Sequence, residues 1–72
     1  MENLTNGQRL VGVNFNPSED QRVAKIKQLS ADLIDEVTSI NSESKVQDSI
    51  VNEAVNQIIT AQMWAVKALF TK

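Results

Sequence analysis

The run from Ser44 to Lys72 contains neither glycine nor proline, and its apolar residues repeat at helical spacing. We predict one long helix over residues 44–71, with Ser42 or Ser44 as its N-cap. The apolar residues of this helix form two faces. One face is Val51, Ala54, Ile58, Ala61, Ala65 and Ala68, and the other is Ile50, Val55, Ile59, Met63, Val66 and Phe70, with Trp64 and Leu69 beside it. A single partner helix cannot cover both faces, so we expect the chain to form a homo-oligomer.

A second helix is predicted over residues 18–40, directly after the chain-breaking pair Asn16-Pro17. Ser18 is a suitable N-cap, and Gln21 stands three residues later, where it completes a capping box. The apolar stripe of this helix is Val23, Ile26, Leu33, Val37 and Ile40, interrupted by Ser30 and widened by Leu29 and Ile34. The connection at residues 41–44 is short, which makes the two helices antiparallel neighbours.

The first 17 residues are predicted to form an arm ahead of the helices. Residues 1–7 are interpreted as a frayed leader, and apolar and small or polar residues alternate from Arg9 to Phe15, which indicates an extended arm or a short strand. The predicted fold is therefore all-α: an antiparallel two-helix hairpin with a short extended N-terminal arm. The whole chain, residues 1–72, is one domain, and we expect copies of it to assemble.

The inventory of reactive side chains argues against an enzyme. The 72 residues include no Cys and no His, so disulfides, thiolate nucleophiles and Cys/His zinc sites are excluded. The acids Asp32, Asp35 and Glu36 are spaced as on a solvated helix face, and the isolated Gly7 and Gly12 form no phosphate-binding loop. We expect no catalysis, no metal and no cofactor. A chain this short then needs self-association for stability.

Charge is distributed unevenly along the chain. Residues 1–27 carry a net charge of +1, residues 28–66 carry −5, and residues 67–72 carry +2. In a hairpin the two cationic ends meet, at the end opposite the acidic loop. The overall charge of −2 argues against binding to polymeric nucleic acid. No apolar run is long enough for a membrane span and no signal peptide is visible, so we expect a cytoplasmic protein.

The segment 15–18 and the cations that follow it form the most interesting cluster. An aromatic ring, an amide, a hydroxyl and the N–H groups of a helix start coincide there with Arg22, Lys25 and Lys27. This combination suits a phosphate-bearing, base-containing ligand. The simpler alternative is that Phe15 is a hydrophobic staple, Ser18 only a cap and the cations merely solvated. Trp64 has the same two interpretations, since it either packs at a helix or subunit interface or stacks on a ligand.

Several runs of the sequence occur in an order and spacing that are moderately specific. They are Asn14-Phe15-Asn16-Pro17-Ser18, then Val23, Ile26 and Lys27, then Ala31-Asp32-Leu33-Ile34-Asp35, and finally Ala61-Gln62-Met63-Trp64-Ala65-Val66-Lys67-Ala68. Over residues 11–72 the chain resembles the small phage proteins that counter CBASS immunity, whose helical hairpin is shared with anti-Thoeris sponges. The resemblance implies a homo-oligomer, typically a hexamer, in the cytoplasm of the host cell. It also implies that pockets of this homo-oligomer bind cyclic di- and trinucleotide messengers such as cGAMP and sequester them without cleavage.

Recognition in that family uses an aromatic residue near the N-terminus, a small polar residue and a lysine of the first helix, contributed by neighbouring subunits. The positions of this chain that the resemblance assigns are Phe15, Asn16, Ser18 and Lys27, with Lys25 as the second choice for the lysine. Pro17, between the two polar residues, is also predicted to belong to the site. Arg9 and Arg22 are added on grounds of charge alone. The family often has glycine after the serine, whereas this chain has Glu19, an acid that would repel a phosphate at that point.

A different class of function remains open on the sequence. In that alternative the chain is a structural or adaptor hairpin whose exposed faces bind the helices of another protein. A third class, a peptide inhibitor of a host enzyme, is neither favoured nor disfavoured by the sequence.

Overall fold

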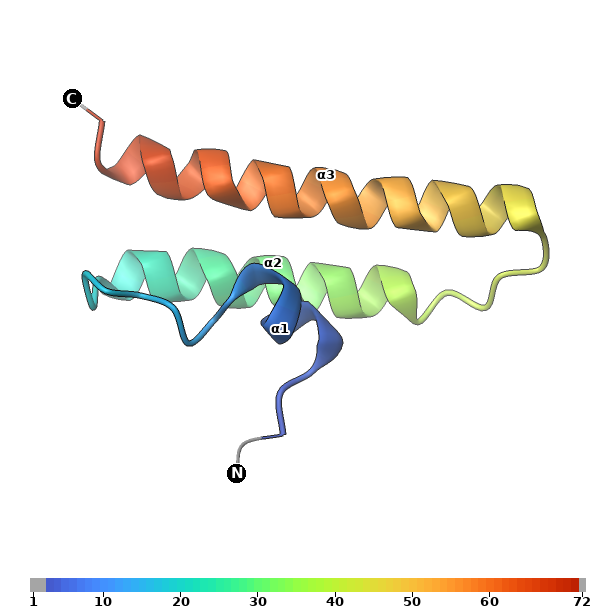
Figure 1. Cartoon of the computed structure of the whole chain (residues 1–72), viewed down its shortest axis with the longest axis horizontal. Helices are drawn as coiled ribbons and strands as arrows, with labels where there is room; N and C mark the ends of the chain where they lie inside the picture. Colours follow the sequence, from blue (N-terminus) through green and yellow to red (C-terminus); the bar gives the residue numbers. More distant parts are fainter. Residues whose placement is uncertain (1–2, 72) are drawn as a thin grey trace.

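The computed structural model describes residues 3–71 and contains three helices: α1 (Asn6–Val11), α2 (Gln21–Thr38) and α3 (Lys45–Leu69). None of residues 3–71 forms a strand, so the predicted all-α class is confirmed. The two long helices lie side by side and run in opposite directions, and the loop that joins them spans residues 39–44 (Figure 1). We call the opposite end of the helix pair, where α2 begins and α3 ends, its open end.

The start of α3 follows from local hydrogen bonding. The hydroxyl of Ser44, one of the two predicted caps, accepts the backbone N–H of Gln47 at 3.0 Å. Asp48 in the first turn and Lys67 in the last turn complement the helix dipole. The helix ends at Leu69, two residues before the predicted boundary.

The start of α2 differs from the prediction. The N-cap is Asp20, whose Oδ1 accepts the N–H of Arg22 at 2.7 Å, so the predicted capping box of Ser18 and Gln21 is wrong. Glu19 adopts a left-handed backbone conformation with φ of 54°, which no α-helix continues through. Ser18 therefore lies in the preceding loop. At the other end α2 stops at Thr38, two residues short of residue 40.

The prediction of an extended arm or short strand is also wrong, because residues 6–11 form the short helix α1. Thr5 and Gln8 form a capping box: the Thr5 hydroxyl accepts the Gln8 N–H at 3.1 Å, and Gln8 Oε1 accepts the Thr5 N–H at 2.9 Å. Gly12, with φ of 67°, ends the helix in the left-handed conformation that glycine adopts readily. These caps outweigh the alternating pattern. Residues 3–7 include the cap and the first turn of α1, and residues 1 and 2 of the predicted frayed leader lie outside the described chain.

The short helix α1 docks on α2 through a glycine. A Cβ atom placed on Gly7 would lie 2.2 Å from the carbonyl oxygen of Ala31, which is completely buried. The Gly7 N–H also donates to Asp35 Oδ1 at 2.7 Å. Asp35 is thus half-buried and anchors the start of α1, whereas we predicted it on a solvated acidic face.

The buried side of α2 is rotated away from the predicted stripe. The buried residues of α2 are Val23, Lys27, Ala31 and Ile34. Of the predicted stripe, Leu33 and Ile40 are exposed, as is the flanking Leu29. The rotation has a tertiary cause, because α1 needs the small Ala31 beneath it.

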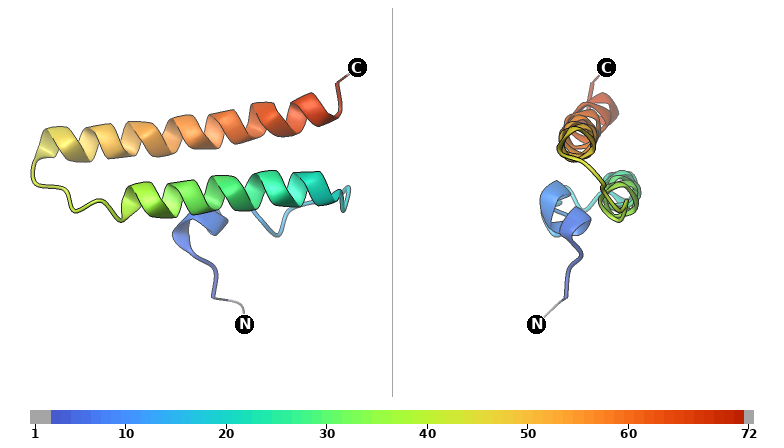
Figure 2. Two further views of the ribbon diagram at one scale, coloured as in Figure 1. Left: turned by 180° about the vertical axis from the view of Figure 1, so that it is seen from behind. Right: turned by 90° about the vertical axis from the view of Figure 1, so that its right-hand side faces the viewer.

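The apolar core is small for the length of the chain. It consists of Val11, Ala31, Ile34 and Val55, with Val13, Val37, Ile58 and Ile59 packed against it. The Cα radius of gyration is 13.4 Å, whereas a compact domain of this length has about 11 Å. The principal-axis extents of 42 × 34 × 12 Å describe a flat molecule. In Figure 2 α1 lies against one face of the pair of long helices, and no helix formed by residues 3–71 lies on the opposite face.

Within residues 3–71, none of the helices combines the length and the apolar character that crossing a membrane requires.

Candidate binding pocket at the open end of the helix pair

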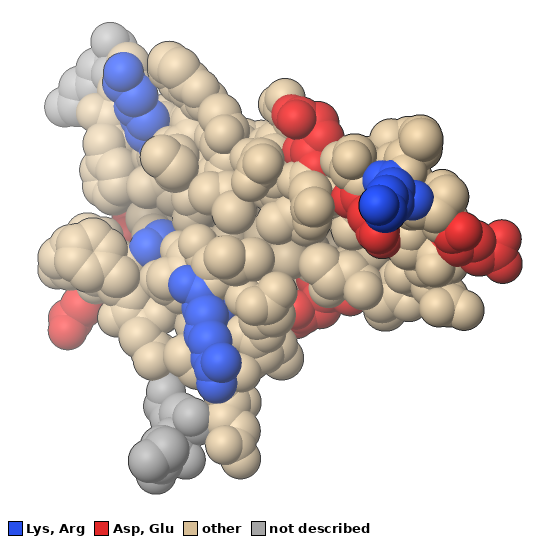
Figure 3. Space-filling view, turned by 45° about the vertical axis from the view of Figure 1, so that its right-hand side comes forward, with Lys and Arg blue, Asp and Glu red and all other residues tan. Residues whose placement is uncertain are grey.

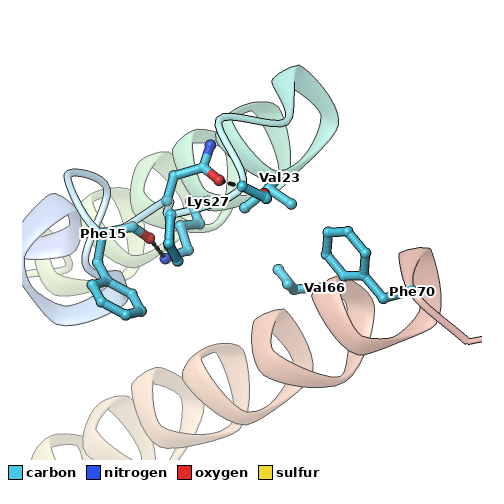
Figure 4. Close-up of a pocket in the computed structure, with 8 residues that line it drawn as sticks. Phe15, Val23, Lys27, Val66 and Phe70 are labelled. Atoms are coloured by element: carbon cyan, nitrogen blue, oxygen red, sulfur yellow. Dashed lines mark hydrogen bonds between the residues drawn. The ribbon is translucent and has the colours of Figure 1, made fainter.

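A pocket of about 210 Å³ lies between the loop before α2 and the last turns of α3 (Figure 4). It is lined by Phe15, Asn16, Pro17, Ser18, Val23, Lys27, Val66 and Phe70. Five of these eight residues are among the eight that we predicted as ligand-binding. The structure thus brings the predicted loop segment and the predicted lysine to one place.

Lys27 holds the loop in position. Its ammonium donates to the carbonyl oxygens of Gly12, at 3.0 Å, and of Phe15, and it lies 5.3 Å from the centre of the Phe15 ring. The side chain is only 8% exposed. Two of the three ammonium protons are therefore used within the chain, so Lys27 acts first as a clamp on the loop.

The polar side chains of the loop are bonded to one another. Asn16 Nδ2 donates to the carbonyl oxygen of Asp20 at 3.0 Å, and the Ser18 hydroxyl donates to Asn16 Oδ1 at 2.9 Å. The Ser18 oxygen in turn accepts the Asp20 N–H at 3.3 Å. These bonds order the backbone that carries Phe15 and make the loop a preformed wall of the pocket. The left-handed Glu19 lies in the same loop, at the position where the resemblance favours glycine.

Two aromatic rings flank the pocket and remain largely open to solvent. Phe15 is 72% exposed and Phe70 is 58% exposed, and each contributes to the pocket wall. Val23 and Val66 supply further apolar lining, from α2 and α3 (Figure 4). We did not predict Val23, Val66 and Phe70 as site residues. Their only signal in the sequence was membership of the apolar faces of the two helices.

The remaining predicted cations lie outside the pocket lining. Arg9, Arg22 and Lys25 are all exposed. Since a helix turns about 100° per residue, Lys25 projects from the side of α2 opposite to Val23 and Lys27. On the face shown in Figure 3, Lys and Arg gather toward the chain ends, whereas most Asp and Glu lie over the loop end beside a single cation. The open end is therefore the cationic end of the layer.

Trp64 does not pack inside the helix pair. It is 63% exposed, and the Lys67 ammonium lies 5.0 Å from the centre of its ring. Thr60 and Met63 complete a shallow pocket of about 260 Å³ beside the indole. Of the two interpretations of Trp64, packing within a single chain is thereby removed, while a subunit contact and a ligand contact both stay open.

The sequence matches no protein-family model, no curated protein and no solved structure at a significant level. Among residues 3–71, no group of three or more acidic, His or Cys side chains is placed to hold a metal ion.

Proposed function

We propose that this chain is a sponge of the anti-CBASS type, which binds host cyclic di- and trinucleotides such as cGAMP and sequesters them without cleaving them. In this proposal the chain acts as a homo-oligomer of helical hairpins, such as a hexamer, in the cytoplasm of the infected host cell. No cofactor, membrane or polymeric nucleic acid takes part.

The observation that carries the proposal is the pocket shared by Phe15, Asn16, Pro17, Ser18 and Lys27. An exposed aromatic ring beside a preformed polar loop suits a nucleobase, because each base has a face for stacking and an edge for hydrogen bonds. The cationic character of the open end favours a ligand that carries phosphates. Arg9, Arg22 and Lys25 enter the proposal only as exposed cations that act over distance or from a neighbouring copy.

The size of the pocket also supports an assembled site. Its volume of about 210 Å³ lies below the roughly 300–1,000 Å³ of sites that enclose a drug-sized ligand. One copy therefore accommodates part of a cyclic dinucleotide. Two copies related by a two-fold axis would present two Phe15 rings, which matches the two bases of such a ligand.

Isothermal titration of the purified protein with a panel of cyclic di- and trinucleotides, and with their linear forms as controls, tests the proposal. We expect stoichiometric submicromolar binding of at least one cyclic member, which chromatography then recovers intact. An absence of binding across the panel, or conversion of the ligand to a linear product, would contradict the proposal.

Phe15→Ala tests the stacking contact. Loss of one stacked base costs about 1–3 kcal/mol, so affinity should fall roughly 5- to 150-fold with no change in the mass of the assembly. Leu10→Ala is the matched control, since Leu10 is an exposed apolar residue at 43% but lies outside the pocket. Equal affinities for the two variants would remove Phe15 from the site.

A second candidate function is favoured by a different observation. Within residues 3–71, ten large apolar side chains are exposed, among them Leu29, Leu33, Ile50 and Trp64. Exposure on this scale is typical of a surface that binds protein. An adaptor hairpin would bind a helical segment of another protein and would give no heat with any nucleotide in the same titration.

A further inference from the structure

The helix pair has an apolar face that no part of the described chain covers. Ile26, Leu29 and Leu33 of α2 follow helical spacing and so lie along one side of that helix. Leu29 is 58% exposed and Leu33 is 51% exposed. Ile40, just beyond the end of α2, continues the stripe and is 49% exposed.

The neighbouring helix extends this face. Ile50, Ala61 and Ala68 of α3 are exposed. Counting about 100° per residue from the buried Ile34 of α2 and the buried Val55 of α3, both stripes turn to the same side of the pair. That side is opposite to α1, which the views in Figure 2 place on the other face. We call it the open face.

Nothing within the described chain shields this face. Domains are built from packed layers of secondary structure around one core. The chain extends only 12 Å along its shortest axis, and its short second layer, α1, lies on the opposite face. A layer over the open face must therefore come from outside the described chain.

The charges along α2 indicate which partner covers the open face and how it is oriented. Arg22 and Lys25 lie in the first turns of α2, whereas Asp32 and Glu36 lie in its second half. A second copy laid head to tail places the cationic end of each α2 beside the acidic end of the other. A copy laid head to head, with open end over open end, brings like charges together. Complementary charge thus favours a head-to-tail pair of identical chains.

We propose that two copies of the chain pair through the open face, with the open end of each over the loop end of the other. This inference rests on the homo-oligomer of the proposed function and names one of its contacts. The two open ends of such a pair lie apart, so a contact that brings two Phe15 rings to one ligand would be a second, different contact. The contact is isologous, because the same surface serves both copies. A contact two helix widths across and as long as α2 would bury roughly 500 Å² of surface on each copy. This buried area is toward the lower end for specific protein interfaces.

A single glutamate on the open face tests the pairing surface. We expect wild-type protein to sediment as an assembly in the absence of nucleotide. Leu33→Glu should raise the dissociation constant of the pair at least tenfold and bring the mass to the monomer, or to half the wild-type value if further contacts join the pairs. Leu10→Glu is the matched control, because Leu10 is also an exposed apolar residue, at 43%, but lies in α1 on the opposite side of the helix pair. Circular dichroism verifies the helix content of both variants.

Charge reversal tests the orientation independently of apolar burial. The double variant Arg22→Glu, Lys25→Glu makes the exposed edge of α2 uniformly acidic and should dissociate the pair. Adding Asp32→Lys and Glu36→Lys restores complementarity with the polarity reversed, so the fourfold variant should recover the wild-type mass. Failure of that recovery, when the double variant has dissociated, would overturn the head-to-tail arrangement.

The readout is mass without ligand, so the two proposals fail separately. A wild-type chain that is monomeric at all concentrations, or a Leu33→Glu variant of unchanged mass, would overturn the pairing surface whatever the nucleotide titration gives. A wild-type pair that dissociates with Leu33→Glu but binds no nucleotide would leave the pairing surface standing and remove the sponge.

Discussion

At the scale of single residues, Lys27 explains how a charged side chain comes to be buried in so small a protein. It donates to two backbone carbonyl oxygens and lies beside the Phe15 ring, which together replace much of its hydration. The loop that carries Phe15 is therefore attached to α2 by one ammonium group. A Lys27→Glu variant would release the loop as well as remove the charge, so its loss of binding would not by itself identify a ligand contact.

Replacement of Lys27 by methionine should destabilise the chain. Hydrogen bonds to charged groups contribute about 1.5–3 kcal/mol each, and we expect the free energy of unfolding to fall by about 2 kcal/mol because methionine keeps the volume but donates nothing. Urea titration followed by circular dichroism measures the change. Lys25→Met, at an exposed position on the opposite side of α2, should change the free energy by less than about 0.5 kcal/mol. Equal effects of the two substitutions would contradict the clamp.

Glu19 provides a second prediction at this scale. A non-glycine residue in the left-handed region costs about 1 kcal/mol or more, and glycine removes that cost while adding some entropy to the unfolded chain. Glu19→Gly should therefore raise the free energy of unfolding by up to about 1 kcal/mol. Glu19→Ala keeps the strain and separates the backbone effect from the loss of charge. If both variants were equally stable, charge and not backbone conformation would be responsible.

At the scale of elements, α1 and α2 form a unit that depends on the absence of a single side chain. Gly7 lets the backbone of α1 approach Ala31, and its N–H reaches Asp35. The docked α1 leads directly into the loop at residues 12–20 that forms one wall of the pocket. The geometry of the candidate site thus depends on a contact some distance from it.

Gly7→Ala should displace α1 from α2. The added methyl group would overlap a backbone carbonyl that cannot move without distorting α2, and overpacking of this kind costs about 1–3 kcal/mol. Hydrogen exchange should show faster exchange of the amide of residue 7 and of residues 12–15, while the middle of α3 stays protected. Asn6→Ala, an exposed substitution in the same helix, is the control. Unchanged exchange in Gly7→Ala would show that α1 is not held through this contact.

At the scale of the whole molecule, the pairing that we propose would couple folding to assembly, because the core within one chain is small and the exposed apolar residues would be buried only in the pair. An assembly that forms only from folded chains makes the apparent stability depend on protein concentration.

The melting temperature of the wild-type protein should therefore rise with concentration. A hundredfold increase is worth about 2.7 kcal/mol for each pair, which corresponds to roughly 5–10 °C for chains of this size. Thermal unfolding followed by circular dichroism measures it, with Leu33→Glu as the variant whose melting temperature should stay constant. A wild-type melting temperature independent of concentration would mean that the folded chain is stable alone.

The sequence by itself determined the features that depend on neighbours in the chain. Helical periodicity without glycine or proline determines α3, Ser44 caps it, and the pair Asn16-Pro17 lies in the loop ahead of α2. The segment 15–18 and Lys27 were also identified as one group, because an aromatic ring, an amide, a hydroxyl and a cation occur close together there. Features of this kind depend on residues three or four positions apart, so the order of residues alone reveals them.

The tertiary structure decided what depends on contacts between distant residues. The contacts of Gly7 with Ala31 and Asp35 place α1 on α2, and together with the bonds of Lys27 to residues 12 and 15 they decide which side of α2 is buried. The same docking leaves Leu29 and Leu33 outside the core. Val66 and Phe70 join the pocket only because α3 returns past the start of α2. Such contacts arise from shape and hydrogen-bond geometry across 12 or more residues, which periodicity and local propensity do not encode.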